Sequence, residues 1–430
     1  MKIIAVKHES NEPTYTTDEL AEIAEDFDIN QTLKEKGYQD EALSFEEAYT
    51  LGAFTLYGLG EEELEDVFET DQELASRQSL AALCTFHNQA NYRSENFSEP
   101  DENAAKQIAG ITAAVFDYDI GTSEYGFVDP DVDTAMDNCG TGGDTFRTPN
   151  VSTLAALTAA SDGVNMLKHG SPGNTDSTGS SDFLDYLGFE QVVPPETSEA
   201  SVEENSFGYT EALNEGYKKI HTQTHEQAQL AHMNDIIGPI TNPMNPETHT
   251  QRVIGVNHLA LPETYAEAYK VLNEKDVTNV DHLFAVRGFV EDGVEGGIDE
   301  ISTMPGGSQV AELKDGQIET MELNAEDFGL EPSDYRQITP DNYEFSKPEM
   351  GVKMLKGEIE NDSRDLIAAN AALLFNLDQG MDLEEGTQKA IAGVLGISYK
   401  KAKEILKEYN QGVNTNTNAK AKIKIQKKAF

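Results

Sequence analysis

The stretch NCGTGGDTFRTPNVST, residues 138–153, combines closely spaced glycines, one carboxylate and a run of hydroxyl side chains. Glycine permits positive φ and lets backbone N–H groups turn inward to form a concave anion site. A helix is expected directly afterwards, in NVSTLAALTAA, and a helix N-terminus favours a phosphate group. Glycine-rich turns before helices are common, so the motif alone is weak evidence. The candidate binding residues are Gly140, Thr141, Gly142, Gly143, Asp144, Asn150, Ser152 and Thr153.

A second loop of the same character follows one helix and one strand later. The expected strand VNML delivers Lys168 and His169 into the loop GSPGNTDSTGSSD. Two such loops would face each other across a cleft, where a lysine at a strand end can offset the charge of a polyanion. Ser171 and Ser180 in the second loop are further candidate binding residues.

The consecutive carboxylates Asp299 and Glu300, in EGGIDEISTMPGG, are the best candidates for holding a divalent metal. A diphosphate held by glycine loops usually needs such a metal, which takes hard oxygen ligands. In a chain with 78 acidic residues, an Asp-Glu pair taken alone is a solvated surface feature. This pair follows a glycine-rich turn and the expected strand HLFAVRG, and that placement favours a Mg²⁺ site.

Charge dominates the composition. The 430 residues carry 78 acidic and 31 basic side chains, for a net charge of -47, and 38% of them are hydrophobic. Such a surface repels itself unless salt screens it, so we expect a halophilic protein with no nucleic-acid partner. The chain shows no apolar run long enough for a membrane span and no export signal, and Cys84 and Cys139 form no disulfide framework. We therefore expect a cytoplasmic protein without a membrane partner.

Helical patterns occupy the first part of the chain. Residues 1-39 are expected to form an acidic helical extension in which Thr17 is an N-cap. Residues 40-118 are expected to form a helical domain. A long helical stretch, Ser198–Gly238, is expected to return the chain to that domain, which residues 205-240 would complete.

Short apolar strands alternating with helices predict an α/β domain over residues 119-204 and 241-410. A hairpin is expected to turn at Asp315-Gly316. Residues 411-430 form a basic low-complexity tail to which we assign no function. The predicted fold class is α/β, with a small all-helical domain and a larger domain on a central, mostly parallel sheet.

Eight motifs resemble those of the anthranilate phosphoribosyltransferase family, in order and at similar spacing. They are GTGGD (140), NVST (150), KHG (168), GSSDFLDYLG (179), IIGPITNP (236), QRVIGV (251), IDEIS (298) and AEDFGL (325). The resemblance covers roughly residues 40–408 and implies the fold shared with the pyrimidine nucleoside phosphorylases, with an active cleft between a helical and an α/β domain.

The resemblance implies phosphoribosyl diphosphate and anthranilate, or another amine or base, as substrates, and a homodimer as the assembly. It implies that the glycine loop, Asn150, Ser152, Thr153 and Lys168 bind phosphoribosyl diphosphate, and that Ser152, Asp299 and Glu300 hold Mg²⁺. Our candidate catalytic residues are Asp144, Lys168 and His169.

Some residues depart from the family pattern. The pattern KHGNR reads KHGSP here, so the Asn that contacts anthranilate is Ser171 and the neighbouring Arg is Pro172. A Ser-Lys pair is replaced by Asp176-Ser177, and the Arg before GPLTNP falls on Ala231. The carboxylate of anthranilate would therefore lack its expected cation partner in this chain, and the identity of the acceptor stays open.

Three histidines lie near that missing Arg, and alternative functions remain. His221, His225 and His232 are read as a polar helix surface in preference to a substitute acceptor site or a metal site. A nucleoside phosphorylase of the same superfamily is an alternative that Mg²⁺ dependence would test. A binding protein without catalysis is the weakest alternative, because the acidic surface disfavours nucleic acid.

Overall fold

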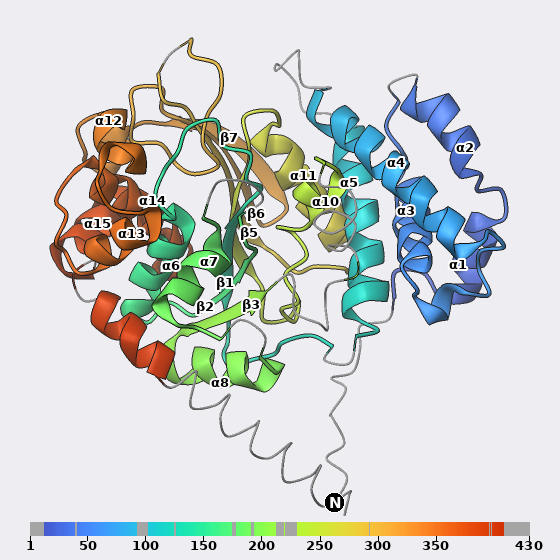
Figure 1. Ribbon diagram of the computed structural model, residues 1–430, viewed down its shortest axis with the longest axis horizontal. Coiled ribbons are helices and arrows are strands. Elements are labelled where there is room, and N and C mark those ends of the chain that lie inside the picture. Colours follow the sequence, from blue (N-terminus) through green and yellow to red (C-terminus); the bar gives the residue numbers. More distant parts are fainter. Residues whose placement is uncertain are drawn as a thin grey trace, which may run out of the picture.

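One seven-stranded sheet forms the centre of the larger part of the molecule (Figure 1). The computed structural model describes residues 13–407 except 39–40, 93–101, 124–125, 174–177, 191–192, 212–218, 220–229, 292, 395 and 397. The sheet order is β3-β2-β1-β4-β5-β6-β7. The strands are β1 (Met136–Gly140), β2 (Met166–Gly170), β3 (Phe207–Glu211), β4 (Gln251–Gly255), β5 (His282–Gly288), β6 (Ser308–Lys314) and β7 (Gln317–Leu323).

The first five strands run parallel, and β6 and β7 add an antiparallel hairpin at one edge. This confirms the predicted mixed α/β class and its mostly parallel sheet. The hairpin turns at Asp315 and Gly316, whose φ angles are 48° and 76°, as a two-residue turn with two positive φ values requires. The predicted turn is therefore confirmed at both positions.

Both faces of the sheet are buried, because neighbouring side chains on each strand point to opposite sides. On β5, Phe284 and Val286 join a core with the helices of one face, whereas Leu283 and Ala285 join the core of the other. The first face carries α6 (Val151–Ser161), α7 (Ser180–Leu187), α13 (Lys347–Leu355), α14 (Asp362–Gln379), α15 (Leu383–Lys389) and η8 (Ala390–Val394). The second carries α11 (Pro262–Glu274).

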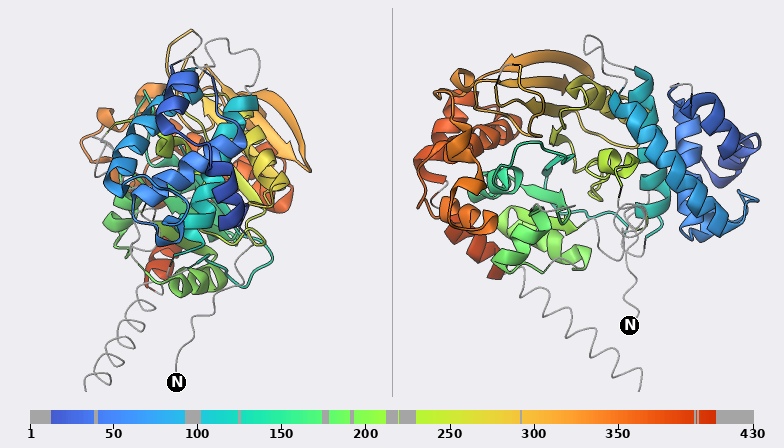
Figure 2. Two further views of the ribbon diagram at one scale, coloured as in Figure 1. Left: turned by 90° about the vertical axis from the view of Figure 1, so that its right-hand side faces the viewer. Right: turned by 45° about the horizontal axis from the view of Figure 1, so that its top comes forward.

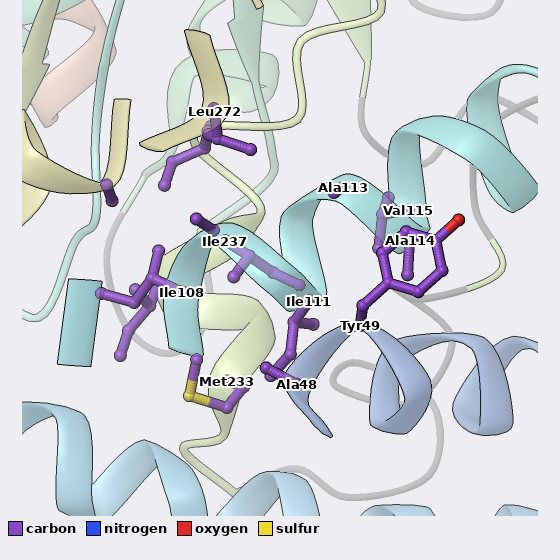
Figure 3. Packing of buried hydrophobic residues seen from close by; sticks show 14 of the residues in the cluster. Ala48, Tyr49, Ile108, Ile111, Ala113, Ala114, Val115, Met233, Ile237 and Leu272 are labelled. Atoms are coloured by element: carbon purple, nitrogen blue, oxygen red, sulfur yellow. The ribbon is translucent and has the colours of Figure 1, made fainter. Parts of the chain in front are cut away.

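A helical layer lies beyond α11 and shares its core. It contains α3 (Phe45–Gly58), η2 (Glu62–Leu64), α4 (Gln72–Tyr92), α5 (Glu102–Val115), η4 (Phe116–Ile120) and α10 (Met233–Ile237). Figure 3 shows Ala48, Ile111, Met233 and Leu272 in this one packed cluster. Ser44 caps α3, since its side chain accepts a hydrogen bond from the N–H of Glu47.

The N-terminal helices α1 (Thr17–Ala24), α2 (Ile29–Thr32) and η1 (Leu33–Gly37) cover the outside of this layer. Figure 2 shows them at the opposite end of the molecule from α14 and α15. Thr16 caps α1, so the predicted cap at Thr17 is wrong by one residue. The predicted domain boundaries stay predictions, and the tail from residue 411 lies outside the described residues.

The predicted helical stretch Ser198–Gly238 is wrong at residues 206–211, which include a strand, whereas residues 212–218 and 220–229 lie outside the described residues. Helix α8 (Pro195–Asn205) ends at Ser206, which adopts a positive φ of 58°, and β3 follows. Phe207 and Tyr209 are buried on β3, which pairs in parallel with β2, so aromatic side chains override the expected helix. His221 and His225 lie outside the described residues, whereas His232 is buried and caps α10 instead of lying on a polar helix surface.

The remaining short helices link the sheet to the C-terminal helices. They are η6 (Ala325–Phe328), α12 (Tyr335–Ile338) and η7 (Pro340–Asn342). Among the described helices, none combines the length and the apolar character that crossing a membrane requires.

Candidate active site

The candidate site lies where the parallel strands end. Strands β1 and β4 end side by side at Gly140 and Gly255, and Asp299 lies directly over both ends. A Cβ atom at Gly140 would collide with the carboxylate of Asp299, and one at Gly255 with its backbone oxygen. These two strands must therefore end in glycine if the segment that carries Asp299 is to reach this edge of the sheet, where open α/β sheets usually bind ligands.

Three carboxylates, Asp144, Asp299 and Glu300, form what we call the acidic cluster. Their oxygens lie within 4.8 Å of one another, with Asp299 and Glu300 buried and Asp144 exposed. The N–H of Gly142 donates to Asp299 Oδ2 over 2.7 Å, and the N–H of Asp299 donates to Asp144 Oδ1 over 2.8 Å. The structure thus joins the glycine loop to the predicted metal ligands and adds Asp144, which we had predicted as a catalytic and binding residue, to that group.

Ionising the carboxylates of the acidic cluster costs free energy. Burial, followed by the charge of Asp299, raises the pKa of Glu300, and burial raises that of Asp299. The Oε2 atom of Glu300 is buried and has no hydrogen-bond partner among the described residues. Three clustered carboxylates, one with an unsatisfied oxygen, are the hard oxygen ligands that Mg²⁺ takes, so these residues fit a divalent cation.

The glycine loop offers fewer free amides than its sequence predicts. The N–H of Thr141 donates to Gly255, and that of Gly142 to Asp299. The N–H groups of Gly143 and Asp144 make no hydrogen bond to the described residues, and Gly142 and Gly143 adopt φ angles of 66° and 81°. The part of the loop available to an anion therefore begins at Gly143.

The second loop meets the first at the starts of two helices. Asn150, at the start of α6, donates from Nδ2 to the backbone oxygens of Thr178 and Gly179 over 2.8 and 3.1 Å. Thr153 Oγ1 donates to Ser180 Oγ over 3.1 Å. The N–H of Val151 donates to Pro149 O, but α6 has no side-chain cap, so the N–H groups of Ser152 and Thr153 in its first turn remain available to an anion. Ser171 lies beside these helix starts, because its backbone oxygen accepts from the N–H of Ser181.

Lys168 and Ser152 lie under the site. Lys168 belongs to β2 itself, is fully buried, and donates from Nζ to Asn138 O over 2.6 Å and to Ser152 Oγ over 3.5 Å. Its ammonium group is therefore already engaged by the backbone of β1. The predicted contact of Lys168 with a polyanion and the predicted metal ligation by Ser152 stay predictions.

His169 is a buried, neutral histidine. Burial, with the charges of Arg252 and Lys168, lowers the pKa of its ring to about 3. Its Nδ1 atom has no hydrogen-bond partner among the described residues, and its backbone N–H donates to Asp137 Oδ1 over 2.9 Å. At neutral pH this ring can offer a lone pair to a substrate but holds a proton weakly. Its catalytic role stays a prediction.

The C-terminal segment contributes a side of the site that sequence reasoning missed. Tyr335 packs edge-on against Phe146 with ring centroids 5.3 Å apart, and its hydroxyl accepts from the N–H of Arg147. Arg147 also pairs with Asp341 over 2.5 Å. Lys347 follows at the start of α13 and lies within electrostatic range of all three carboxylates of the acidic cluster. The Ser346 cap and Pro348 signal a helix start, but no local pattern connects it with Asp144.

The comparisons with known proteins agree with this geometry. Residues 132–395 match the family model described as "Glycosyl transferase family, a/b domain". The chain is 32% identical over 297 residues to an anthranilate phosphoribosyltransferase of Haemophilus influenzae, covering 68% of this chain and 81% of that protein. It is 33% identical over 270 residues to one of Methanopyrus kandleri, covering 61% and 75%. The chain therefore belongs to this glycosyltransferase family and, within it, to the anthranilate phosphoribosyltransferases.

Solved structures share the fold. Anthranilate phosphoribosyltransferase from Thermus thermophilus superposes with a TM-score of 0.63 at 24% identity, covering 88% of this chain and 98% of that one. The enzyme from Saccharomyces cerevisiae in complex with PRPP and Mg gives 0.63 at 22% identity, covering 85% and 93%. The resemblance inferred from the motifs is therefore confirmed for the family and the fold.

Proposed function

We propose that this protein transfers the phosphoribosyl group of phosphoribosyl diphosphate to the amine of anthranilate, a step of tryptophan biosynthesis, and releases diphosphate. The observation that carries the proposal is the acidic cluster at the strand ends, together with the N–H groups of Gly143, Asp144, Ser152 and Thr153, which make no hydrogen bond to the described residues. A Mg²⁺ ion held by the cluster would neutralise charge on the diphosphate as it leaves. The backbone amides would bind the phosphate oxygens.

The residues of the chain would act mainly by positioning. The amine attacks C1 of the ribose while the bond from C1 to the diphosphate oxygen breaks, and the amine proton leaves to solvent or to a nearby base. Such a reaction needs a stabilised leaving group more than a strong base, which suits a neutral His169. Asp144, Asp299 and Glu300 are the proposed Mg²⁺ ligands, with Ser152 as a further predicted one.

The identity of the acceptor is tested by assaying turnover with anthranilate. Purified protein in molar KCl is incubated with Mg²⁺, phosphoribosyl diphosphate and anthranilate, while the anthranilate fluorescence and the diphosphate released are followed. Equal loss of anthranilate and gain of diphosphate is the expected result, and it would show that Ser171 and Ala231 are tolerated in place of the family residues. Binding of phosphoribosyl diphosphate with anthranilate left intact would instead assign a different amine or base.

The same experiment tests two properties of the whole protein. Because a net charge of -47 needs screening, we propose that activity is higher in molar than in low KCl. We also propose that the active species is a homodimer, for which the family resemblance is the support. Sedimentation in the assay buffer measures the assembly, and a monomer with full activity would refute it.

A further inference from the structure

Lys347, at the start of α13, is positioned to contact the leaving group of the proposed reaction. Resting on that proposed function, we propose that Lys347 binds the diphosphate of the phosphoribosyl donor on the side opposite the glycine loop. The proposal depends on three observations: where α13 is held, what surrounds the Lys347 ammonium, and how the neighbouring cations are already used.

Helix α13 is held close to the two helix starts that line the site. A Cβ atom at Gly351 would lie 2.6 Å from Phe183 of α7 and 3.5 Å from Leu154 of α6, so α13 touches both helices in their first turns. The glycine at this position lets α13 approach both helices closely, and Lys347 lies one helical turn before it. Lys347 itself lies within electrostatic range of the acidic cluster, at a helix start that favours negative charge.

The ammonium of Lys347 faces negative charge without being paired. Glu300, Asp144 and Asp299 all act on it electrostatically, although burial is the largest influence and lowers its pKa. Lys347 nevertheless makes no hydrogen bond and no ion pair with a described residue. A lysine has three N–H donors, and leaving all of them unused in a largely enclosed position is costly unless a ligand completes them.

The other cations near the cluster are already engaged. Lys168 donates to Asn138 O and Ser152 Oγ beneath the sheet edge, and Arg147 pairs with Asp341. Among the described residues that act on the acidic cluster, Lys347 is the cation with unused donors. A diphosphate carries more charge than one divalent ion neutralises, and an ammonium group is a common second partner for its oxygens.

The test measures binding by calorimetry, so it does not depend on turnover. Lys347→Met removes the charge at similar length, Lys347→Arg retains it, and Lys353→Met is the control, because Lys353 lies on the same helix and pairs with Glu358 over 3.7 Å. The ligands are inorganic diphosphate with Mg²⁺, phosphoribosyl diphosphate with Mg²⁺, ribose 5-phosphate, and Mg²⁺ alone. Circular dichroism and the unfolding midpoint establish that each variant is folded.

We expect Lys347→Met to weaken binding of both diphosphate ligands about tenfold or more, because a charge-assisted hydrogen bond is lost. Ribose 5-phosphate should be unaffected, and Mg²⁺ alone should bind as tightly or more tightly, since a neighbouring positive charge is gone. Lys347→Arg should stay close to wild type, and Lys353→Met should change affinity less than about twofold.

Two outcomes would overturn the proposal. If Lys347→Met binds both diphosphate ligands as wild type does, Lys347 only balances the charge of the acidic cluster. If it loses Mg²⁺ and diphosphate to the same degree, its role is in building the cluster. Failure of the wild-type protein to bind phosphoribosyl diphosphate at all would refute the proposed function instead, so the two failures can be told apart.

Discussion

Strand β1 carries one buried carboxylate, Asp137, and ends at the loop that supplies part of a second acidic site. Asp137 forms an ion pair with Arg252 of β4 over 2.8 Å, and both side chains are fully buried. The acidic cluster, to which the loop after β1 contributes Asp144, has three carboxylates and no cation within ion-pair distance among the described residues. The charge of Asp137 is compensated inside the protein, whereas the charge of the acidic cluster is available to a ligand.

The compensated pair holds the sheet and a loop together. Arg252 donates from its guanidinium to the backbone oxygens of Pro239 and Ile240 and lies 5.7 Å from the ring centroid of Tyr269. Asp137 accepts the N–H of His169 on the neighbouring strand. The pair therefore fixes the loop after α10 against β1, β2 and β4. The ion pair of Asp137 and Arg252 thus stabilises the fold, whereas the acidic cluster is suited to binding a ligand.

The largest effect is expected from Glu300→Gln. The change removes one of three clustered negative charges while retaining the size of the side chain, so turnover with Mg²⁺ should fall about 10²- to 10³-fold. The metal-free protein should be as stable as wild type or more stable, because repulsion within the acidic cluster is relieved. Steady-state turnover and thermal unfolding in molar KCl, with and without Mg²⁺, measure both.

If metal-free Glu300→Gln is less stable than wild type, this prediction is wrong, because the charge of Glu300 would then be compensated inside the protein as that of Asp137 is. The change Glu349→Gln at a half-buried position in the first turn of α13 serves as the control for removing one negative charge near the site. It should leave turnover close to that of wild type.

Arg252→Met should have the opposite profile, with a large effect on stability. Removing one partner of a buried ion pair leaves Asp137 uncompensated and should cost about 3–5 kcal/mol of unfolding free energy. Urea unfolding measures the loss. The double change Asp137→Asn with Arg252→Met should recover part of it, because no unpaired charge remains. If Arg252→Met does not fold, the double variant still provides a test, because it should fold. A double variant no more stable than Arg252→Met would contradict the interpretation of Asp137 and Arg252 as a compensated ion pair.

Sequence reasoning reached the parts of the site that short motifs encode. Gly142, Asp299 and the start of α6 carry local signals, and the mostly parallel sheet follows from alternating strands and helices. The grouping of Asp144 with Asp299 was not predictable in the same way, because it depends on two strands ending side by side. Lys347 was missed for a related reason, since α13 returns to the site only through tertiary packing.

Strand β3, at one edge of the sheet, was also missed because it depends on tertiary packing. A run of acidic and polar residues after Ser198 has helical character, and α8 satisfies that pattern. Strand β3 forms because Phe207 and Tyr209 bury their rings beside β2, which a local pattern does not record. No local pattern marks Arg252 as buried either, whereas the structure buries it completely.

Asp117, in η4, is a third kind of carboxylate, partly buried and without a cation, and we expect the smallest effect from changing it. Its Oδ2 accepts hydrogen bonds from the Tyr49 hydroxyl over 2.6 Å and from the N–H of Thr14 over 3.0 Å, with no cation among these partners. Burial outweighs these bonds and raises its pKa to about 6. The raised value means that Asp117 stabilises the fold below about pH 4 and that this contribution is lost as the pH rises through about 6.

Asp117→Asn mimics the protonated acid and should therefore remove this pH dependence. We expect the variant and wild type to be similar near pH 4 and the variant to be more stable by about 2–3 kcal/mol near pH 8, at 1.36 kcal/mol per pKa unit. Urea unfolding in molar KCl at both pH values gives the difference, and the exposed Glu65→Gln change controls for losing one negative charge. A stability difference that is the same at both pH values would mean that neutral hydrogen bonds compensate a buried carboxylate as well as Arg252 does.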